Sequence, residues 1–301
     1  MSCLLTIAIP TWNRAPFLLI NLRNITKHIT LFQIYDIRVL VVDNASSDDT
    51  TKVVRAFQKK FNYIEYVKND ENIGSTANFL KAISLVNSKY VHLLGDDDLL
   101  DEKYFEYFPK ILNYHDYGVI FLNSYGFDLD PAIEKPFSIN SSILSFNKFD
   151  DLVLKCIQNV TFISVFILNS DLAKNKNHFE NNSEINFSEI VFFIGQSKFK
   201  NIYIEDYLVA AKRNNAIMEV FPKLFMNDFM GIVDNLHGKI SAENIMKFKS
   251  MYFFGYLPMY ILRERINFPH KSRDLLISID NICHLHPFAR FFLKKNNFYQ
   301  P

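Results

Sequence analysis

The run Tyr90-Val91-His92-Leu93-Leu94-Gly95-Asp96-Asp97-Asp98 carries the most information about the architecture of this chain. Its first half is a short apolar stretch that predicts a buried strand, and three adjacent carboxylates follow where that strand ends. Such carboxylates repel one another, and the next residues, Leu99 to Asp101, include no Lys or Arg. A divalent cation with oxygen ligands, Mg²⁺ or Mn²⁺, is therefore a natural partner. The alternative is a solvated acidic turn that caps the next helix.

The residues around this run alternate between short apolar segments and helical patterns. Strands are predicted at 4–9, 37–42, 63–67, 90–94 and 117–123, and helices at 15–28, 47–60, 74–86 and 101–114. Alternation of this kind implies parallel strands joined by right-handed crossovers. We therefore expect an α/β fold, a Rossmann-like and mainly parallel sheet flanked by helices.

Four polar clusters fall at the carboxyl ends of the predicted strands. They are Thr11-Asn13-Arg14, Asp43-Asn44-Ala45-Ser46, Asn72-Gly74 and Asp96-Asp97-Asp98. Ligands of parallel α/β sheets bind at this edge. Loops alone would explain one or two such clusters, so four of them predict a ligand site that spans several strands.

Single residues in these clusters have both a binding and a structural interpretation. Asp43 could accept hydrogen bonds from a nucleobase or a ribose, or it could cap the next helix. Arg14 could contact phosphate or form a surface salt bridge. Asn78 lies inside a predicted helix, where Asn is unfavourable, so we expect its amide to bond either to the neighbouring loops or to a substrate. Asp96 and Asp97 could divide metal binding and a sugar hydroxyl between them.

Composition restricts the class of protein. The chain has 301 residues, 49% of them hydrophobic and 22% charged, which is typical of a globular protein with a sizeable core. A net charge of +1 gives no reason to expect nucleic acid as a partner. Its three cysteines are far apart in the sequence, which fits a reducing cytoplasm. We find no signal peptide and no apolar run long enough to span a bilayer, and we expect a cytoplasmic protein.

The pattern is less regular after Gly126. We expect a loop at 128–147, a helix at 149–158, a strand at 162–168, a helix at 188–196, a strand at 201–211 and a mostly helical C-terminal region. This organisation suggests a first domain over residues 1–220 and a helical extension over residues 221–301. The extension contains a basic and aromatic tail at 263–295, which could approach an anionic membrane surface or serve as a lid or a dimer contact. The oligomeric state is left open.

The four polar segments, in this order and spacing, resemble the family 2 glycosyltransferases, which have the GT-A fold. The matching residues are Ile9-Pro10-Thr11-Trp12-Asn13-Arg14, Val42-Asp43-Asn44-Ala45-Ser46-Ser47-Asp48-Asp49-Thr50, Asn72-Ile73-Gly74 with Ala77-Asn78, and Leu93-Leu94-Gly95-Asp96-Asp97-Asp98. The resemblance covers about residues 1–125. The form of the last two segments is most similar to the abequosyltransferase-like branch, which decorates bacterial O-antigen.

The resemblance implies a metal-dependent, inverting glycosyltransferase that uses a nucleoside-diphosphate sugar as donor. Its acceptor would be a saccharide, lipid-linked, in the synthesis of bacterial surface polysaccharide (O-antigen, capsule or lipooligosaccharide), at the cytoplasmic face of the inner membrane. The residues implied for nucleotide-sugar binding are Thr11, Asn13, Arg14, Asp43, Asn44, Ser46, Asn72, Asn78 and Asp96. Asp97 and Asp98 are the implied ligands of Mn²⁺ or Mg²⁺. Many relatives read Asp-x-Asp-Asp, whose first Asp corresponds to Gly95 here, so the choice between Asp97 and Asp98 stays open.

Inverting members of the family use a carboxylate as general base, often in a Glu-Asp pair that opens a helix in the second half. The best match is Ser188-Glu189, which puts Glu189 in the position of the catalytic base although the pair is not intact. Glu184 and Glu205-Asp206 are rivals, and a Glu in a first helical turn is also favourable to the helix dipole.

Two other functions were weighed. A sugar-phosphate nucleotidylyltransferase would need a Gly-rich phosphate loop after the first strand, and Pro10-Thr11-Trp12-Asn13 is not one. A non-catalytic nucleotide-sugar-binding protein would not need intact acidic clusters.

Overall fold

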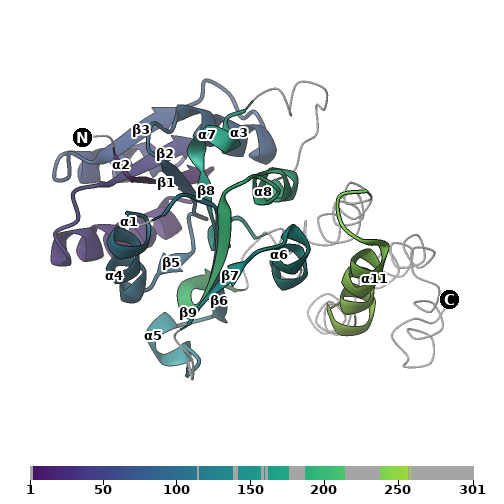
Figure 1. Cartoon of the computed structure of the whole chain (residues 1–301). Coiled ribbons are helices and arrows are strands. Elements are labelled where there is room, and N and C mark those ends of the chain that lie inside the picture. Colours follow the sequence, from purple (N-terminus) through teal and green to yellow (C-terminus); the bar gives the residue numbers. More distant parts are fainter. Residues whose placement is uncertain are drawn as a thin grey trace. The chain divides into compact units, whose positions relative to one another are not determined.

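The computed structural model describes residues 3–113, 115–137, 142–156, 159, 162–175, 187–213, 238–256 and 258. The chain divides into two compact units, residues 1–147 with 162–214 and residues 148–161 with 215–301. In Figure 1 the first unit is a sheet with helices on both of its faces. The expected domain boundary near residue 220 lies outside the described residues and remains a prediction.

In the described part of the chain, nine strands form one sheet in the order β3-β2-β1-β4-β8-β6-β9-β5, and β7 pairs with β9. The strands are β1 (Leu5–Thr11), β2 (Ile37–Asp43), β3 (Ile64–Lys68), β4 (Tyr90–Leu93), β5 (Leu99–Leu100), β6 (Tyr117–Phe127), β7 (Ile143–Phe146), β8 (Phe166–Asn169) and β9 (Lys200–Lys212). The pairs β3-β2, β2-β1 and β1-β4 are parallel. The predicted α/β fold is therefore confirmed, and the five strands predicted before residue 125 are all present.

Three strands, β5, β7 and β8, depart from the parallel expectation, and β5 and β7 both pair antiparallel with β9. β8 runs antiparallel between β4 and β6, with Asn169 opposite Tyr90 and Phe166 opposite Phe121. As a result β6 has the direction of β4 but is not its neighbour. The apolar pattern of 162–168 contains no signal for strand direction, so the insertion could not be read from it.

The segment 128–147, expected to be a loop, also contains regular structure. It holds α5 (Pro131–Glu134) and β7, and β7 pairs antiparallel with β9 from Ile143 opposite Ile204 to Phe146 opposite Asn201. β7 has only four residues, Ile-Leu-Ser-Phe, and three of them are exposed, so it adds little to the core and is too short to stand out from the polar residues around it. The expectation of a loop was wrong for these residues.

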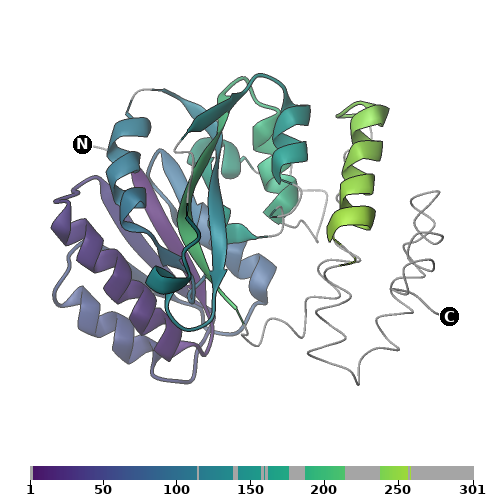
Figure 2. The same ribbon diagram turned by 90° about the horizontal axis from the view of Figure 1, so that it is seen from below.

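Helices cover both faces of the sheet. They are α1 (Ala15–Leu31), α2 (Thr50–Gln58), α3 (Ser75–Leu85), α4 (Glu102–Ile111), α7 (Ser170–Ala173) and α8 (Phe187–Gly195), with a 3-10 turn η1 (Ile163–Val165) before β8. Seen from below, α1, α2 and α4 lie in front of the sheet (Figure 2), whereas α3, α7 and α8 lie on its other side (Figure 1). α1 buries Leu18, Leu22, Ile25 and Ile29, which form one helical stripe.

The second unit is described only in part. α6 (Phe149–Cys156) packs against α11 (Ala242–Ser250), which continues into a π-helical turn η5 (Met251–Tyr256). Asn244 Nδ2 donates to Asp150 Oδ2 at 2.6 Å and ties these two helices together. The basic tail at 263–295 lies outside the described residues. No helix in the described part of the chain has the length and apolar character needed to span a bilayer.

Candidate functional site

The carboxyl ends of the parallel strands bring the predicted polar clusters together. Thr11 is the register partner of Asp43, and Asp43 is the register partner of Lys68. The backbone N–H of Asn44 donates to Thr11 O at 2.9 Å, and that of Asn69 donates to Asp43 O at 2.8 Å. The loops that follow β1, β2 and β3 therefore start side by side at one edge of the sheet.

The acidic run after β4 is joined to the loop after β1. Thr11 Oγ1 donates to Asp96 Oδ2 at 2.6 Å, and Arg14 Nε donates to Asp96 Oδ1 at 2.7 Å. A terminal nitrogen of the same guanidinium also donates to Asp97 Oδ2. The flanking positions supply no Lys or Arg, but Arg14, from the loop after β1, is a cation of the protein that pairs with two of the three carboxylates.

Burial makes the carboxyl groups of Asp96 and Asp98 hard to ionise. The pKa of Asp96 is raised by burial to about 6, although Arg14 and the Thr11 hydroxyl oppose the rise. The pKa of Asp98 is raised by burial and by the neighbouring charge of Asp97. The site therefore favours positive charge close to the acidic run.

Asp98 has a different environment from Asp96 and Asp97. Its Oδ2 accepts from Ser164 Oγ at 2.5 Å, and its Oδ1 accepts from the backbone N–H of Lys212 at 3.1 Å. Ser164 Oγ also accepts from the Gly95 backbone N–H at 2.9 Å. Asp98 thus ties the acidic turn to η1 and to the end of β9, whereas Asp97 Oδ2 accepts from Arg14.

Gly95 has a steric reason to be glycine. A Cβ at this position would lie 2.7 Å from Asp98 Oδ2 and 3.3 Å from Ser164 Oγ. A side chain at residue 95 would therefore require the Asp98 carboxylate to shift from its bonds with Ser164 and Lys212.

Asp43 is completely buried and holds the loop that follows β2. Its Oδ1 accepts from the Ser46 N–H at 2.8 Å, and its Oδ2 accepts from the Tyr66 hydroxyl at 2.5 Å. Burial and the bond to Asp43 raise the pKa of Tyr66 to about 12, so its hydroxyl remains a donor. Asn13 fastens the same loop, because its N–H donates to Ser46 Oγ at 2.8 Å.

Four asparagines link the ends of β2 and β3 to the start of α3. Asn44 Nδ2 donates to Asn72 Oδ1 at 2.7 Å, and Asn69 Nδ2 donates to Asn44 Oδ1 at 2.9 Å and to Asn78 Oδ1 at 3.0 Å. Asn78 Nδ2 donates to Val42 O at 3.1 Å. The expected hydrogen bonds of Asn78 are confirmed, and they hold the loops in place.

Glu189 lies in the first turn of α8, on the helix that packs against β6 and β8. A Cβ at Gly118, near the start of β6, would meet Ile194 O at 3.2 Å and Ser197 Oγ at 3.0 Å. The C-terminal end of α8 therefore lies at the amino edge of β6. The role of Glu189 as base stays a prediction.

The rival bases lie elsewhere. Glu184 lies outside the described residues. Glu205 accepts from the Ser142 hydroxyl, and Asp206 pairs with Lys103 Nζ at 3.1 Å and accepts from the Tyr107 hydroxyl at 2.5 Å. Asp206 is nearly fully buried by these contacts, so it links β9 to α4.

Three residues at this edge were not singled out from the sequence. Trp12 is 51% exposed beside Thr11, and Asn69 follows β3 directly. A polar or aromatic residue that follows a strand is the same signal that marked the other clusters, so both could have been found. Ser164 carries no such signal, because it is a single hydroxyl inside an apolar run.

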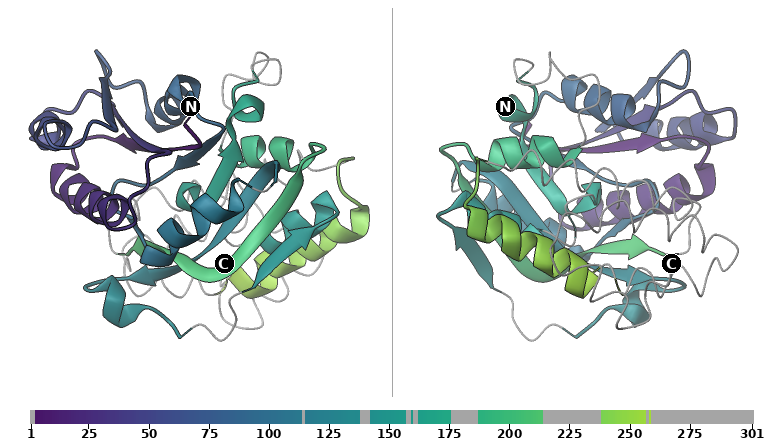
Figure 3. Two further views of the ribbon diagram at one scale, coloured as in Figure 1. Left: turned by 60° about the vertical axis from the view of Figure 1, so that its left-hand side comes forward. Right: turned by 90° about the vertical axis from the view of Figure 1, so that its right-hand side faces the viewer.

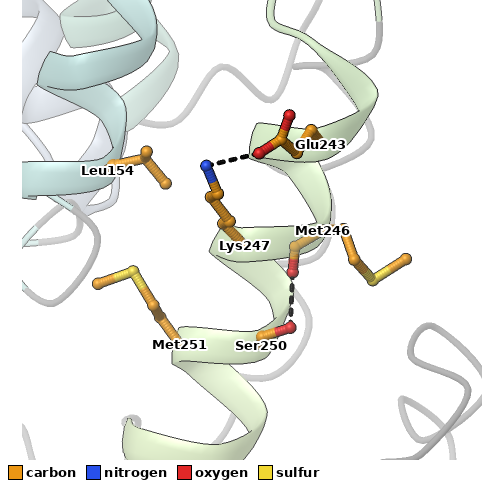
Figure 4. Close-up of a pocket in the computed structure, with 6 residues that line it drawn as sticks. All are labelled: Leu154, Glu243, Met246, Lys247, Ser250 and Met251. Atoms are coloured by element: carbon orange, nitrogen blue, oxygen red, sulfur yellow. Dashed lines mark hydrogen bonds and ion pairs between the residues drawn. The ribbon is translucent and has the colours of Figure 1, made fainter.

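No group of three His, Cys, Asp or Glu side chains in the described residues could hold a metal ion unaided. Two cavities in the described parts lie away from the acidic run. One, of about 390 Å³, is in the second unit and is lined by Leu154 and by residues of α11 and η5 (Figure 4). Its polar side chains bond locally, Lys247 to Glu243 at 2.8 Å and Ser250 to Met246 O at 2.8 Å, so the cavity offers no reactive cluster.

Comparison with protein families decides the assignment. Residues 6–171, more than half of the chain, match the family described as glycosyl transferase family 2. The chain belongs to this family. The matched region contains the acidic run, Arg14 and the loops that follow β1, β2 and β3.

Curated relatives match over a shorter region. The abequosyltransferase RfbV of Salmonella typhimurium is 36% identical over 100 residues, which are 32% of this chain and 29% of that protein. The glycosyltransferase GlyG of Streptococcus pneumoniae is 23% identical over 128 residues, which are 42% of this chain and 41% of that protein. The alignments thus span less than half the length of these relatives.

Solved structures share the fold. TarS of S. aureus in complex with UDP-GlcNAc has a TM-score of 0.63 at 13% identity, over 94% of this chain and 82% of that chain. The mannosyltransferase PcManGT of Pyrobaculum calidifontis, in complex with GDP-Man and Mn²⁺, has a TM-score of 0.58 at 14% identity, over 98% and 84%. This likeness confirms the expected GT-A architecture.

Proposed function

We propose that this family 2 member is a metal-dependent, inverting glycosyltransferase that moves a sugar from a nucleoside-diphosphate sugar to a saccharide acceptor. The observation that carries the proposal is the pairing of Arg14 with Asp96 and Asp97 at the edge where the loops after β1, β2 and β3 also meet. Buried acids and a cation at such an edge suit a phosphorylated ligand. The related folds that bind UDP-GlcNAc and GDP-Man support the donor class.

The acidic run fits a divalent cation. Asp96 and Asp97 are both less than 10% exposed and already share one cationic group, so their oxygens converge on a position suited to positive charge. Mg²⁺ and Mn²⁺ are commonly held by one or two carboxylates, with phosphates and water as the remaining ligands. Such an ion would stabilise the negative charge that develops on the departing diphosphate. We assign Asp97 as the ligand.

The other residues at the edge would orient the donor. Asp96, held by Thr11, is positioned to accept from a ribose hydroxyl, and Arg14 is positioned to bind phosphate. Asp43 and the asparagines keep the surrounding loops in one conformation, which reduces the ordering cost of binding. The exposed indole of Trp12 offers a flat apolar face to a nucleobase.

We assign Glu189 as the general base that takes the proton from the attacking acceptor hydroxyl. Attack on the anomeric carbon from the face opposite the diphosphate gives inversion. The match to an abequosyltransferase supports an acceptor in bacterial surface polysaccharide, lipid-linked at the cytoplasmic face of the membrane.

A thermal-shift panel with UDP, CDP, GDP and dTDP, each with and without Mn²⁺, tests the donor site. A ligand at about 100 times its dissociation constant stabilises by roughly 2.7 kcal/mol, which is a shift of several degrees for a chain of this size. We expect one nucleotide to give a shift that depends on Mn²⁺. Failure of all four nucleotides would contradict the proposal.

Substitutions of Asp97 and Glu189 test metal binding and base catalysis separately. Asp97→Asn should remove the Mn²⁺-dependent shift, whereas Asp116→Asn, an exposed aspartate paired with Lys89 near the amino edge, should not. Glu189→Gln should keep nucleotide binding and lose transfer to an acceptor. Transfer that survives in Glu189→Gln would exclude this residue as the base.

A further inference from the structure

The segment between β6 and β7 exposes three large apolar side chains. Leu129 is 93% exposed, Ile133 is 82% exposed and Phe137 is 91% exposed, and we call these three residues the apolar tip. Side chains of this size are normally covered in a folded protein. Nothing in the proposed transfer reaction uses them.

The backbone of the tip is held firmly. The carboxylate of Glu134 accepts from the backbone N–H groups of Asp128 at 2.9 Å, Leu129 at 2.7 Å and Asp130 at 3.0 Å. The Tyr125 hydroxyl donates to Pro131 O at 2.7 Å. The apolar side chains are therefore presented to solvent by a fixed scaffold.

The tip lies at the same edge of the sheet as the candidate site. β6 has the direction of β4 and ends at Phe127, so the tip leaves the carboxyl edge, and α5 lies at the end of β6 in Figures 1 and 3. Lys212 joins the two regions, because its backbone N–H donates to Asp98 Oδ1 at 3.1 Å and its Nζ donates to Asp128 O at 2.5 Å. Whatever binds the tip would be close to the edge that carries the acidic run.

We propose that the apolar tip inserts into the interfacial region of a lipid bilayer. Three such side chains offer on the order of 500 Å² of apolar surface, which is less than the about 800 Å² per partner of a standard protein interface. A bilayer needs no complementary partner surface, and binding to it grows with the apolar area inserted.

The charged side chains around the apolar tip indicate whether electrostatic attraction would contribute to its binding to lipid. Three carboxylates are balanced by three cationic side chains: Asp128, Asp130, Glu134, Lys135, Lys212 and Arg213. All three cations are engaged locally: Lys135 pairs with Asp101 at 2.5 Å, Arg213 pairs with Asp128 at 3.4 Å, and Lys212 Nζ donates to Asp128 O at 2.5 Å. Binding through the tip should therefore be apolar, with little dependence on lipid charge or salt. The basic tail at 263–295 would give the opposite behaviour.

Co-sedimentation of the full chain with phosphatidylcholine vesicles, and with vesicles that also contain phosphatidylglycerol, tests the proposal at low and high salt. The test variant is Leu129→Ser/Ile133→Ser/Phe137→Ser. The matched control is Leu31→Ser/Tyr35→Ser, which removes side chains that are 61% and 87% exposed just before β2, at the amino edge. Each inserted side chain of this size is worth about tenfold or more in affinity.

We expect the full chain and the control to bind both kinds of vesicle at both salt concentrations, and the triple variant to bind at least about 100-fold more weakly. Equal binding by the triple variant, or no binding by the full chain, would overturn the proposal. So would binding confined to anionic vesicles and lost in salt, or self-association that the triple variant abolishes. Nucleotide binding by the same variants needs no vesicles, so this result is separate from that of the transferase proposal.

Discussion

Arg14 Nε lies 2.7 Å from Asp96 Oδ1, although the two residues are 82 positions apart in the chain. The fold makes this pair by placing β1 beside β4, so that the loop after β1 reaches the acidic run. The same guanidinium also bonds to Asp97. Arg14 thus provides positive charge where the proposed metal and phosphate groups would act.

Arg14→Gln should destabilise the protein and increase its response to metal. Breaking a fully buried ion pair costs about 3–5 kcal/mol, and Arg14 is 18% exposed, so we expect a loss of about 2 kcal/mol. Mn²⁺ alone should then raise the melting temperature more in the variant than in the wild type, because two buried carboxylates have lost their cation. Arg38→Gln is the control, since its pair with Glu65 is half exposed and spans 3.6 Å. Equal Mn²⁺ shifts in Arg14→Gln and the wild type would contradict this prediction.

Part of the candidate site could be predicted from the sequence, because ligands of parallel α/β sheets bind at the carboxyl ends of the strands. Apolar runs predicted the positions of β1 to β4 and β6 in the sequence. Because parallel strands end at one edge of a sheet, the residues that follow them, Thr11, Asp43 and Asp96, were expected to lie together. This prediction uses only local sequence pattern and the direction of parallel strands. It was therefore sufficient for the first half of the chain, where strands and helices alternate.

Long-range contacts explain what could not be predicted. The pairing of Arg14 with Asp96 depends on side-chain direction after a turn, where Asn13 has a φ of 54°. The place of Ser164 depends on the antiparallel insertion of β8, and neither polarity nor spacing indicates it. The sequence left the proposed metal ligand open between Asp97 and Asp98, and the contacts of Asp98 that favour Asp97 in our proposal come from Ser164 and Lys212, which are distant in the chain.

Asp97→Asn and Asp98→Asn should have different effects. Asp97→Asn should abolish Mn²⁺-dependent nucleotide binding with little change in stability. Asp98→Asn should lower the free energy of unfolding by about 1–3 kcal/mol, because an amide nitrogen replaces one of two oxygens that accept from buried donors. Titration calorimetry with nucleotide and Mn²⁺, together with denaturant unfolding, measures both quantities. If only Asp98→Asn removes metal dependence, Asp98 is the ligand and the assignment of Asp97 is wrong.

Ser164→Ala should weaken both the fold and the site. Ser164 Oγ bridges the Gly95 N–H and Asp98 Oδ2, so its loss leaves buried groups unpaired and should cost about 2–3 kcal/mol. Nucleotide affinity in Mn²⁺ should fall as well, because the turn that carries Asp97 is no longer held. Ser170→Ala is the matched control, because Ser170 is equally buried and its Oγ has no hydrogen-bond partner. A similar loss of stability in both variants would contradict the bridging role.

His92 should make stability depend on pH. Its ring is fully buried, with Nε2 2.8 Å from Ser164 O and Nδ1 2.8 Å from the Tyr104 hydroxyl. A carbonyl oxygen can only accept, so Nε2 carries the proton and Nδ1 accepts from Tyr104. Burial lowers the pKa of His92 from 6.5 to about 4.

Between pH 6.5 and 4 the unfolded chain binds a proton at residue 92 that the folded protein does not bind. The free energy of unfolding contributed by His92 is therefore complete above pH 6.5 and falls as the pH is lowered, by up to about 3 kcal/mol at pH 4. The raised pKa values of Asp96 and Asp98 act in the opposite direction, because these acids take up protons more readily when folded. A wild-type curve alone would mix the two effects. Denaturant unfolding of the wild type and His92→Gln from pH 7.5 to 4 separates them, since Gln can keep both hydrogen bonds and does not titrate. We expect the advantage of the wild type to shrink as the pH falls, and an advantage that is constant over this range would show that His92 is not the group that titrates.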